Sequence, residues 1–192
     1  MEEIEYLDEY EKRLEKLLAG LCGTEGGMFL VEELEERWKE DVPEYMVDAV
    51  SQINHYPAFT LAVAGFYGMA LAALWDTNWE AHKNDSYVGF KTLGGGFDTV
   101  DEYILEHILD IKPDSHFRTQ VDDMMRTLSH TVMTAIQHEN IEHQTTRAFY
   151  ILARSAKVMF RAGVTFELRH RGYHYEKLRL EDFMPKNNEI AN

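Results

Sequence analysis

The polar residues best suited to bind a metal lie together in the string HENIEH at 138–143. If the helix predicted for 115–138 continued through this string, Glu139, Glu142 and His143 would share its apolar face, because each helical residue turns by about 100°. Two carboxylates and an imidazole in a core are costly unless they bind a metal or are fully hydrogen-bonded. Ferritin-like di-metal proteins use Glu and His ligands from four helices in this way. These three residues are therefore the candidate metal ligands.

The sequence lacks the remainder of a di-metal site. The motif is Glu-x-x-Glu-His rather than Glu-x-x-His, and the similar string EYILEH places Glu102 and Glu106 on the outward face of its helix. A helix break at 139–141 accounts for the same residues without a metal, with Asn140 as the cap of the next helix and Glu142 in its first turn. A hydrogen-bonded polar layer is a third interpretation.

Aromatic residues gather around the predicted end of an apolar helix over 57–82. Trp75 and Trp79 are one helical turn apart, and His82 follows them before a stretch rich in glycine. Aromatic side chains beneath a loop are typical of small-molecule pockets. The alternative is that these residues form the rim of the core. The predicted ligand-binding residues are Trp75, Trp79, His82, Tyr87 and Phe90.

A basic stripe is predicted on the last long helix. Arg147, Arg154 and Arg161 fall seven residues apart, and Lys157 lies beside them, whereas residues 1–48 carry 16 acids and 5 bases. Such a stripe is solvated, or it docks against the acidic N-terminal helices of the same chain. The sharper hypothesis is that the four cations form an interaction site for an anion or a protein partner.

Other reactive residues do not form a known catalytic pattern. Cys22 is the single cysteine, which excludes an internal disulfide and a multi-cysteine zinc site. The sequence contains no Gly-x-Ser-x-Gly and no His-Glu-x-x-His string. The triplet Gly94-Gly95-Gly96 precedes acidic residues, which would repel a phosphate. We therefore predict a protein without an assembled catalytic site, and the sequence does not identify a cofactor.

The spacing of apolar residues predicts that these groups stand on helices. Apolar residues recur at steps of three and four, as on one face of a helix, over 3–21, 28–40, 57–82, 115–138 and 142–170. Glu11 is the single interruption of the first stripe. Pro43 fits the first turn of a further helix, and Gly163 is expected to cost the last helix about 1 kcal/mol relative to alanine.

The stretch from Pro57 to Trp75 is almost wholly apolar, and the longer run from Ala49 to Trp75 contains no Asp, Glu, Lys or Arg. Nineteen apolar residues are long enough to cross a bilayer. However, the stretch is rich in Ala and Gly, and no Lys or Arg anchors its ends. This composition favours the central helix of a bundle over a membrane span. The residues at 83–97 are expected to form a long loop, with Asp98 capping the helix that follows.

These patterns predict an all-α, single-domain bundle of about seven helices over residues 1–184, with a flexible tail at 185–192. The net charge of −15 argues against a nucleic-acid partner. The first residues lack the features of a signal peptide, so a cytoplasmic location is expected. The leading functional hypothesis is a helical binding or adaptor protein that forms a homo-oligomer or binds a protein partner. The alternatives are a metal-dependent, di-metal carboxylate enzyme and a small-molecule sensor with an aromatic pocket.

Overall fold

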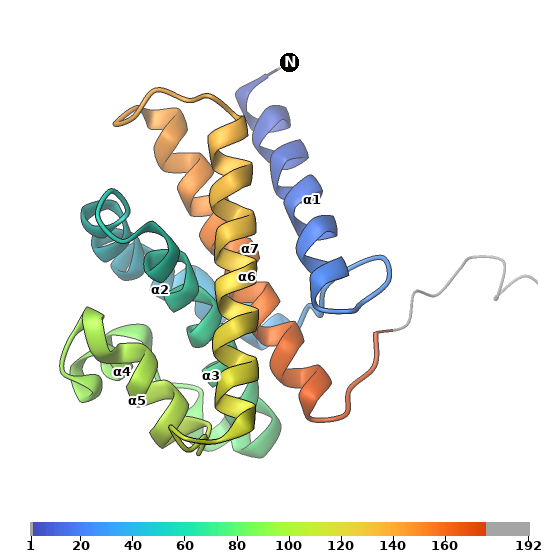
Figure 1. Ribbon diagram of the computed structural model, residues 1–192, viewed down its shortest axis with the longest axis vertical. Helices are drawn as coiled ribbons and strands as arrows, with labels where there is room; N and C mark the ends of the chain where they lie inside the picture. The colour runs from blue at the N-terminus through green and yellow to red at the C-terminus, as the bar shows by residue number, and fades with distance from the viewer. Residues whose placement is uncertain (1, 176–192) are drawn as a thin grey trace, which may run out of the picture.

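The computed structural model describes residues 2–175, which contain seven α-helices and no strand, as the sequence predicts (Figure 1). A 3₁₀ turn precedes the short helix α5, and a π-helical turn at Ile104–Ile108 follows it. The seven helices are α1 Glu3–Leu21, α2 Glu32–Gln52, α3 Pro57–His82, α4 Tyr87–Gly94, α5 Val100–Tyr103, α6 His116–His138 and α7 Thr146–His170. The predicted flexible tail at 185–192 lies outside the described residues.

Helices α3 and α7 form the centre of the bundle. Every residue of α3 from Thr60 to Leu74 is buried, which explains why this helix is apolar on all sides. The two helices approach so closely that a Cβ atom on Gly163 would overlap the backbone carbonyl of Gly65. A Cβ atom on Gly68 would likewise overlap the carbonyl of Phe160. Small residues thus bring the two backbones into direct contact.

Helix α3 is the one described helix that is long and apolar enough to cross a membrane by length and composition. In the structure, 83% of its most apolar window is buried inside the fold. The other helices therefore cover the apolar surface that makes this helix resemble a membrane span.

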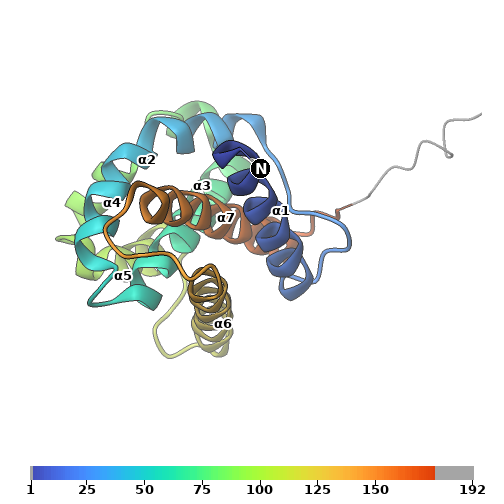
Figure 2. The same ribbon diagram turned by 90° about the horizontal axis from the view of Figure 1, so that it is seen from above.

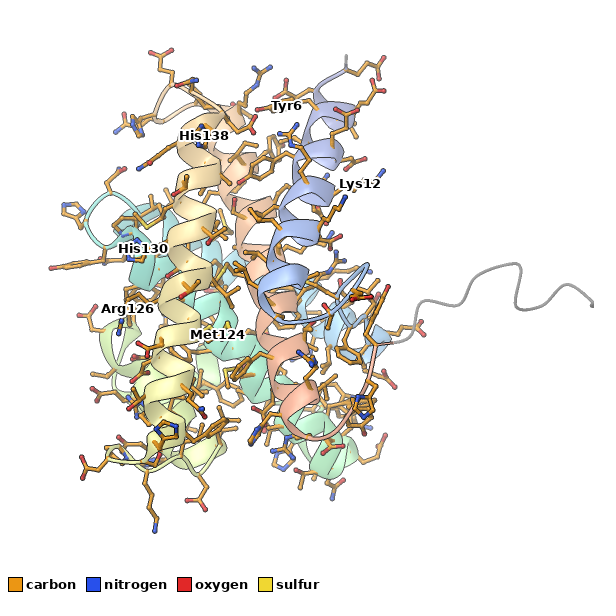
Figure 3. All side chains as sticks on the ribbon, turned by 45° about the vertical axis from the view of Figure 1, so that its right-hand side comes forward. Tyr6, Lys12, Met124, Arg126, His130 and His138 are labelled. Atoms are coloured by element: carbon orange, nitrogen blue, oxygen red, sulfur yellow. The ribbon has the colours of Figure 1, made fainter. Side chains whose placement is uncertain are left out.

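Helices α1 and α6 flank α7, and α2 and α6 lie on opposite sides of it (Figures 1 and 2). The N-terminal end of α1 lies beside the C-terminal end of α6. There the Tyr6 hydroxyl donates a hydrogen bond to Glu139, and Arg13 forms an ion pair of 2.7 Å with the same carboxylate. Figure 3 shows Tyr6 projecting from α1 toward this end of α6, close to His138.

Three predictions about helix ends are wrong. Pro43 lies inside α2, which runs on through the expected boundary. The predicted loop at 83–97 contains α4, because the Ser86 side chain caps it by accepting a hydrogen bond of 3.1 Å from the Gly89 amide. Asp98 does not cap the next helix, since it lies within the 3₁₀ turn that leads into α5.

The predicted helix break at 139–141 is confirmed, because α6 ends at His138. The predicted cap is wrong. Asn140 has a left-handed backbone (φ 49°) and lies six residues before the next helix begins. Thr145 caps α7 instead, since its hydroxyl accepts a hydrogen bond of 3.2 Å from the Ala148 amide. The break leaves a loop at 139–145 that projects from one end of the bundle (Figure 1).

Candidate functional site

The structure separates the three candidate metal ligands. Glu139 is hydrogen-bonded to Tyr6 and Arg13, and burial together with this hydrogen bond raises the pKa of Tyr6 to about 12. Glu142 and His143 lie exposed in the loop after α6. Between residues 2 and 175, no three His, Cys, Asp or Glu side chains are placed to hold a metal ion. The helix break therefore leaves Glu142 and His143 in an exposed loop, whereas the partly buried Glu139 is engaged by Tyr6 and Arg13.

The predicted aromatic site is divided between the core and the surface. Tyr87 and Phe90 are buried, and each ring packs at 5.8 Å from that of Tyr67. Trp75 packs instead against Tyr173 at 6.1 Å. Trp79 is only partly buried against the core, and His82 is hydrogen-bonded to its neighbour Asp85. None of the three cavities that we find among the described residues is lined by any of the five predicted residues.

The basic stripe of α7 docks against acidic residues of α1 and α2. Arg147 pairs with Glu3 and Arg154 with Asp8, and Arg161 reaches Glu15 and Glu35. The centre of this network is Glu11, which is only 6% exposed and accepts from Arg154, Arg161 and Lys157. Burial acts to raise the pKa of Glu11, but the hydrogen bonds from Lys157 and Arg154 outweigh it and hold the pKa below its usual value. All four cations are thus engaged within the chain.

A largely apolar cavity lies where two connections between helices approach each other. This cavity of about 570 Å³ separates the corner between α2 and α3 from the end of α6 and the start of α7. Figure 1 shows the loop after α6 and the corner after α2 projecting from the same side of the molecule. The apolar residues that line the cavity are Val50, Ile53, Pro57, Leu61, Met133, Ile136, Ala148, Phe149 and Leu152.

Local sequence explains why this space stays open. Helix α2 ends at Gln52, and Pro57 opens α3 only five residues later, so the chain turns a sharp corner. On the opposite wall, Ala148 contributes only a methyl group, whereas its neighbours in the lining have larger side chains. The corner and the small residue together leave a gap that the neighbouring leucine and isoleucine side chains do not fill.

The rim of the cavity is polar but carries no permanent charge. Five lining residues can donate or accept hydrogen bonds, namely Asn54, Gln137, His143, Gln144 and Thr145. Among residues 2–175, no Asp, Glu, Lys or Arg lines the cavity, although 28% of the chain is charged. A charged ligand would lose its hydration there without gaining a counter-ion. The site therefore favours a neutral molecule with an apolar body and a polar end.

The loop at the mouth has an unusual backbone. Asn140 and Gln144 have positive φ angles of 49° and 62°, in the left-handed region that residues other than glycine rarely adopt. Strained residues of this kind are concentrated in ligand-binding loops and active sites. Gln144 itself lines the cavity, so the strained position presents one of the polar rim groups.

Replacing Gln144 with glycine is expected to raise the free energy of unfolding by about 0.5 kcal/mol, because glycine removes the left-handed strain. Gln137 provides a matched control, since it lines the same rim but lies in the last turn of α6. There the same change should lower stability by about 0.5–1 kcal/mol. Urea denaturation of both variants measures the difference. An equal decrease in the free energy of unfolding of the two variants would show that the backbone of Gln144 is not strained.

Apolar side chains continue from the cavity onto the surface. Val50 is 49% exposed and Phe149 43% exposed at the mouth, and Val47 and Tyr56 are also exposed on the elements beside it. Exposed apolar patches on soluble proteins usually mark sites of binding. The mouth of the cavity thus has the character of a recognition surface.

Sequence reasoning missed this site because its residues carry no motif. The one available signal was the run from Ala49 to Trp75 without Asp, Glu, Lys or Arg, which begins before α3 and includes Val50, Ile53 and Asn54. Comparison with protein families, curated proteins and solved structures finds no match to this chain. The predictions of a cytoplasmic location and of a homo-oligomer or protein partner stay predictions.

Proposed function

We propose that the protein is a helical binding protein for a neutral, amphipathic small molecule, held in the cavity between the α2–α3 corner and the α6–α7 loop. The observation that carries the proposal is the lining of that cavity, which joins apolar walls to a rim of uncharged hydrogen-bonding groups. Small-molecule sites in proteins commonly combine mostly apolar walls with a few polar groups that fix orientation.

The dimensions of the cavity fit this function. Its volume of about 570 Å³ lies within the usual range for sites that hold drug-sized ligands, roughly 300–1,000 Å³. Burial of an apolar body against Leu61, Ile136 and Leu152 would supply most of the affinity, at about 25 cal/mol per Å² of apolar surface. Asn54, Gln137 and Gln144 would then select a ligand with a neutral polar end.

The proposal requires binding and no catalysis. His143 is the only titratable side chain in the lining, and it has no carboxylate or nucleophile beside it there. A general base needs a partner that orients it and a group that it can activate. A carrier or a sensor of an apolar metabolite fits this lining better than an enzyme does.

Titration with N-phenyl-1-naphthylamine, a neutral apolar dye that fluoresces when it leaves water, tests the proposal. The dye should bind the wild-type protein saturably at one site. Replacing Ala148 with phenylalanine fills the cavity and should weaken binding by about tenfold or more, since it removes the space for roughly one aromatic ring. Thr134→Phe adds the same bulk on the exposed face of α6 and should leave binding unchanged.

Thermal unfolding of both variants shows whether Ala148→Phe has disturbed the fold. If it has, Val50→Gln provides a second test, because Val50 is half exposed at the mouth and its polar replacement reduces the apolar wall. Dye binding that does not saturate, or that is the same in both pocket variants as in the wild type, would overturn the proposal.

A further inference from the structure

A second cavity lies at the opposite ends of α6 and α7. It has a volume of about 710 Å³ and is bounded by the end of α1, the first half of α6 and the last turn of α7. In Figure 3, the space between α1 and α6 faces the viewer, with α7 behind it. Met124 lies on the side of α6 toward this space, whereas Arg126 and His130 project from the other side.

Arg169, which lines this cavity, differs from the other arginines that the structure describes. Every other arginine between residues 2 and 175 forms an ion pair with an acidic side chain. Within the described part of the chain, Arg169 donates only to the backbone carbonyl of Cys22, which is a neutral acceptor. Arg169 is thus the one arginine among residues 2–175 without a carboxylate partner there, and it is exposed.

The edge of Arg169 that has no acceptor is the one that binds carboxylates best. Its bond to Cys22 uses Nη1, and among the described residues nothing accepts from Nε or Nη2. Arg161 uses these two atoms to hold the two oxygens of Glu35, at 2.8 and 2.7 Å. Arg147 holds Glu3 through the same two atoms. Such bidentate pairs are the strongest hydrogen bonds that arginine makes to an anion.

The charges that the structure places near Arg169 do not compensate it. Asp123 also lines the cavity, but it forms an ion pair of 2.9 Å with Arg126. Burial raises the pKa of the Cys22 thiol to about 11, so the cysteine adds no negative charge at neutral pH. The charge of the guanidinium is therefore available to a ligand.

Most of the remaining lining is aromatic or apolar, and Gln120 and Thr127 are its uncharged polar residues. The rings of Phe117 and His170 are stacked at 4.1 Å with an angle of 19° between their planes. Phe166, Met124 and Leu21 line the same space. Stacked rings and a methionine sulfur favour contact with a planar apolar group.

We propose that this cavity binds a small aromatic carboxylate, with the carboxylate on the Nε–Nη2 edge of Arg169 and the ring against Phe117 and Phe166. The proposal is independent of the neutral site at the other end of the bundle, with which the cavity shares no residue. The unpaired arginine and the aromatic wall together define the class of ligand.

Isothermal titration with 2-naphthoate tests this second site, and 2-naphthamide serves as the neutral ligand of the same shape. Because 2-naphthamide is itself a neutral amphipathic molecule that fits the site proposed between the α2–α3 corner and the α6–α7 loop, the two ligands are compared in the Ala148→Phe background, where that site is filled and naphthoate should bind more tightly than the amide. Arg169→Gln should weaken the binding of naphthoate by about tenfold or more and leave the binding of the amide unchanged. Only the carboxylate of naphthoate pairs with the charge of the Arg169 guanidinium. Arg147→Gln removes the same charge from an exposed ion pair at the far end of α7 and should have no effect.

A further variant keeps the test valid if Arg169→Gln alters the fold. Thr127→Glu places a negative charge in the cavity from an exposed position and leaves the bond from Arg169 to Cys22 in place. Thr127→Glu should also weaken the binding of naphthoate and leave the binding of the amide unchanged. Equal affinities for the two ligands in the Ala148→Phe background, or naphthoate binding that neither Arg169→Gln nor Thr127→Glu changes, would exclude the anion site.

Discussion

Replacing Gly163 with alanine is expected to destabilise the protein by about 3 kcal/mol or more, although alanine is the better helix former. The added methyl group would overlap the carbonyl oxygen and carbonyl carbon of Gly65. Backbone atoms cannot move aside as a side chain can, so α3 and α7 would have to separate along their length. For a chain of this size, the midpoint of thermal unfolding should fall by roughly 6–12 °C.

Gly20 is the matched control, because it lies in α1 and a Cβ atom there would meet nothing within 4 Å. Gly20→Ala should therefore raise stability by up to about 1 kcal/mol, the gain expected from helix propensity. Circular dichroism during heating and in urea measures both variants. Gly163→Ala should lower the free energy of unfolding, and Gly20→Ala should raise it. A Gly163→Ala variant as stable as the wild type would show that the two backbones are not in contact.

The second large effect is expected at Glu11. Replacing it with glutamine keeps its shape but removes the one charge on which Arg154, Lys157 and Arg161 converge. Breaking a buried ion pair leaves unpaired charges and typically costs 3–5 kcal/mol. Because the three cations are 13–30% exposed and partly hydrated, we expect a loss of about 2–3 kcal/mol. Glu9→Gln, on the exposed side of the same helix, should change stability by less than about 0.5 kcal/mol.

The effect at Glu11 should depend on pH. Its pKa in the folded protein is lowered from the usual 4.5. The stabilisation is therefore complete above pH 4.5 and is lost as the pH falls through the lower, folded value. Urea denaturation should show a large difference between wild type and Glu11→Gln at pH 7 and a smaller one at pH 3. A difference that stayed constant over this range would mean that the charge of Glu11 is not what stabilises the fold.

Much of the fold could be predicted from the sequence, because helices with one buried face repeat their apolar residues every three to four positions. The apolar spacing over 115–138 predicts one buried face, and in α6 that face includes the buried residues Val121, Met125 and Leu128. The apolar sequence of α3 gave its central position. These predictions succeeded because burial within a helix depends mainly on local periodicity.

The predictions that depend on contacts between helices were less successful. Gly163 was read as a cost to its helix, whereas the structure shows that the contact with Gly65 requires it. Glu11 was read as a lapse in an apolar stripe, but it is the acceptor that the arginines of α7 need. In both cases the reason for the residue lies on another helix, more than 90 positions away in the sequence.

The candidate site was even less visible in the sequence. Its walls come from the α2–α3 corner, the end of α6 and the start of α7, and none of these segments carries a recognised motif. Apolar and amide side chains have no spacing that marks them as ligand contacts. By contrast, Glu139, Glu142 and His143 were predicted as metal ligands because of their residue types. Helix α6 ends before them, and they do not form a metal site among the described residues. The position of a cavity follows from how helix ends meet, which a single sequence does not specify.

Two methionines on α6 provide the most direct test of the binding site. Met133 lines the neutral cavity and Met124 lines the second one. In protein labelled with carbon-13 at the methionine methyl groups, addition of N-phenyl-1-naphthylamine should shift the signal of Met133 and leave that of Met124 in place. A shift of Met124 alone, or equal small shifts of many methionines, would contradict a neutral-ligand site at the corner of α2 and α3.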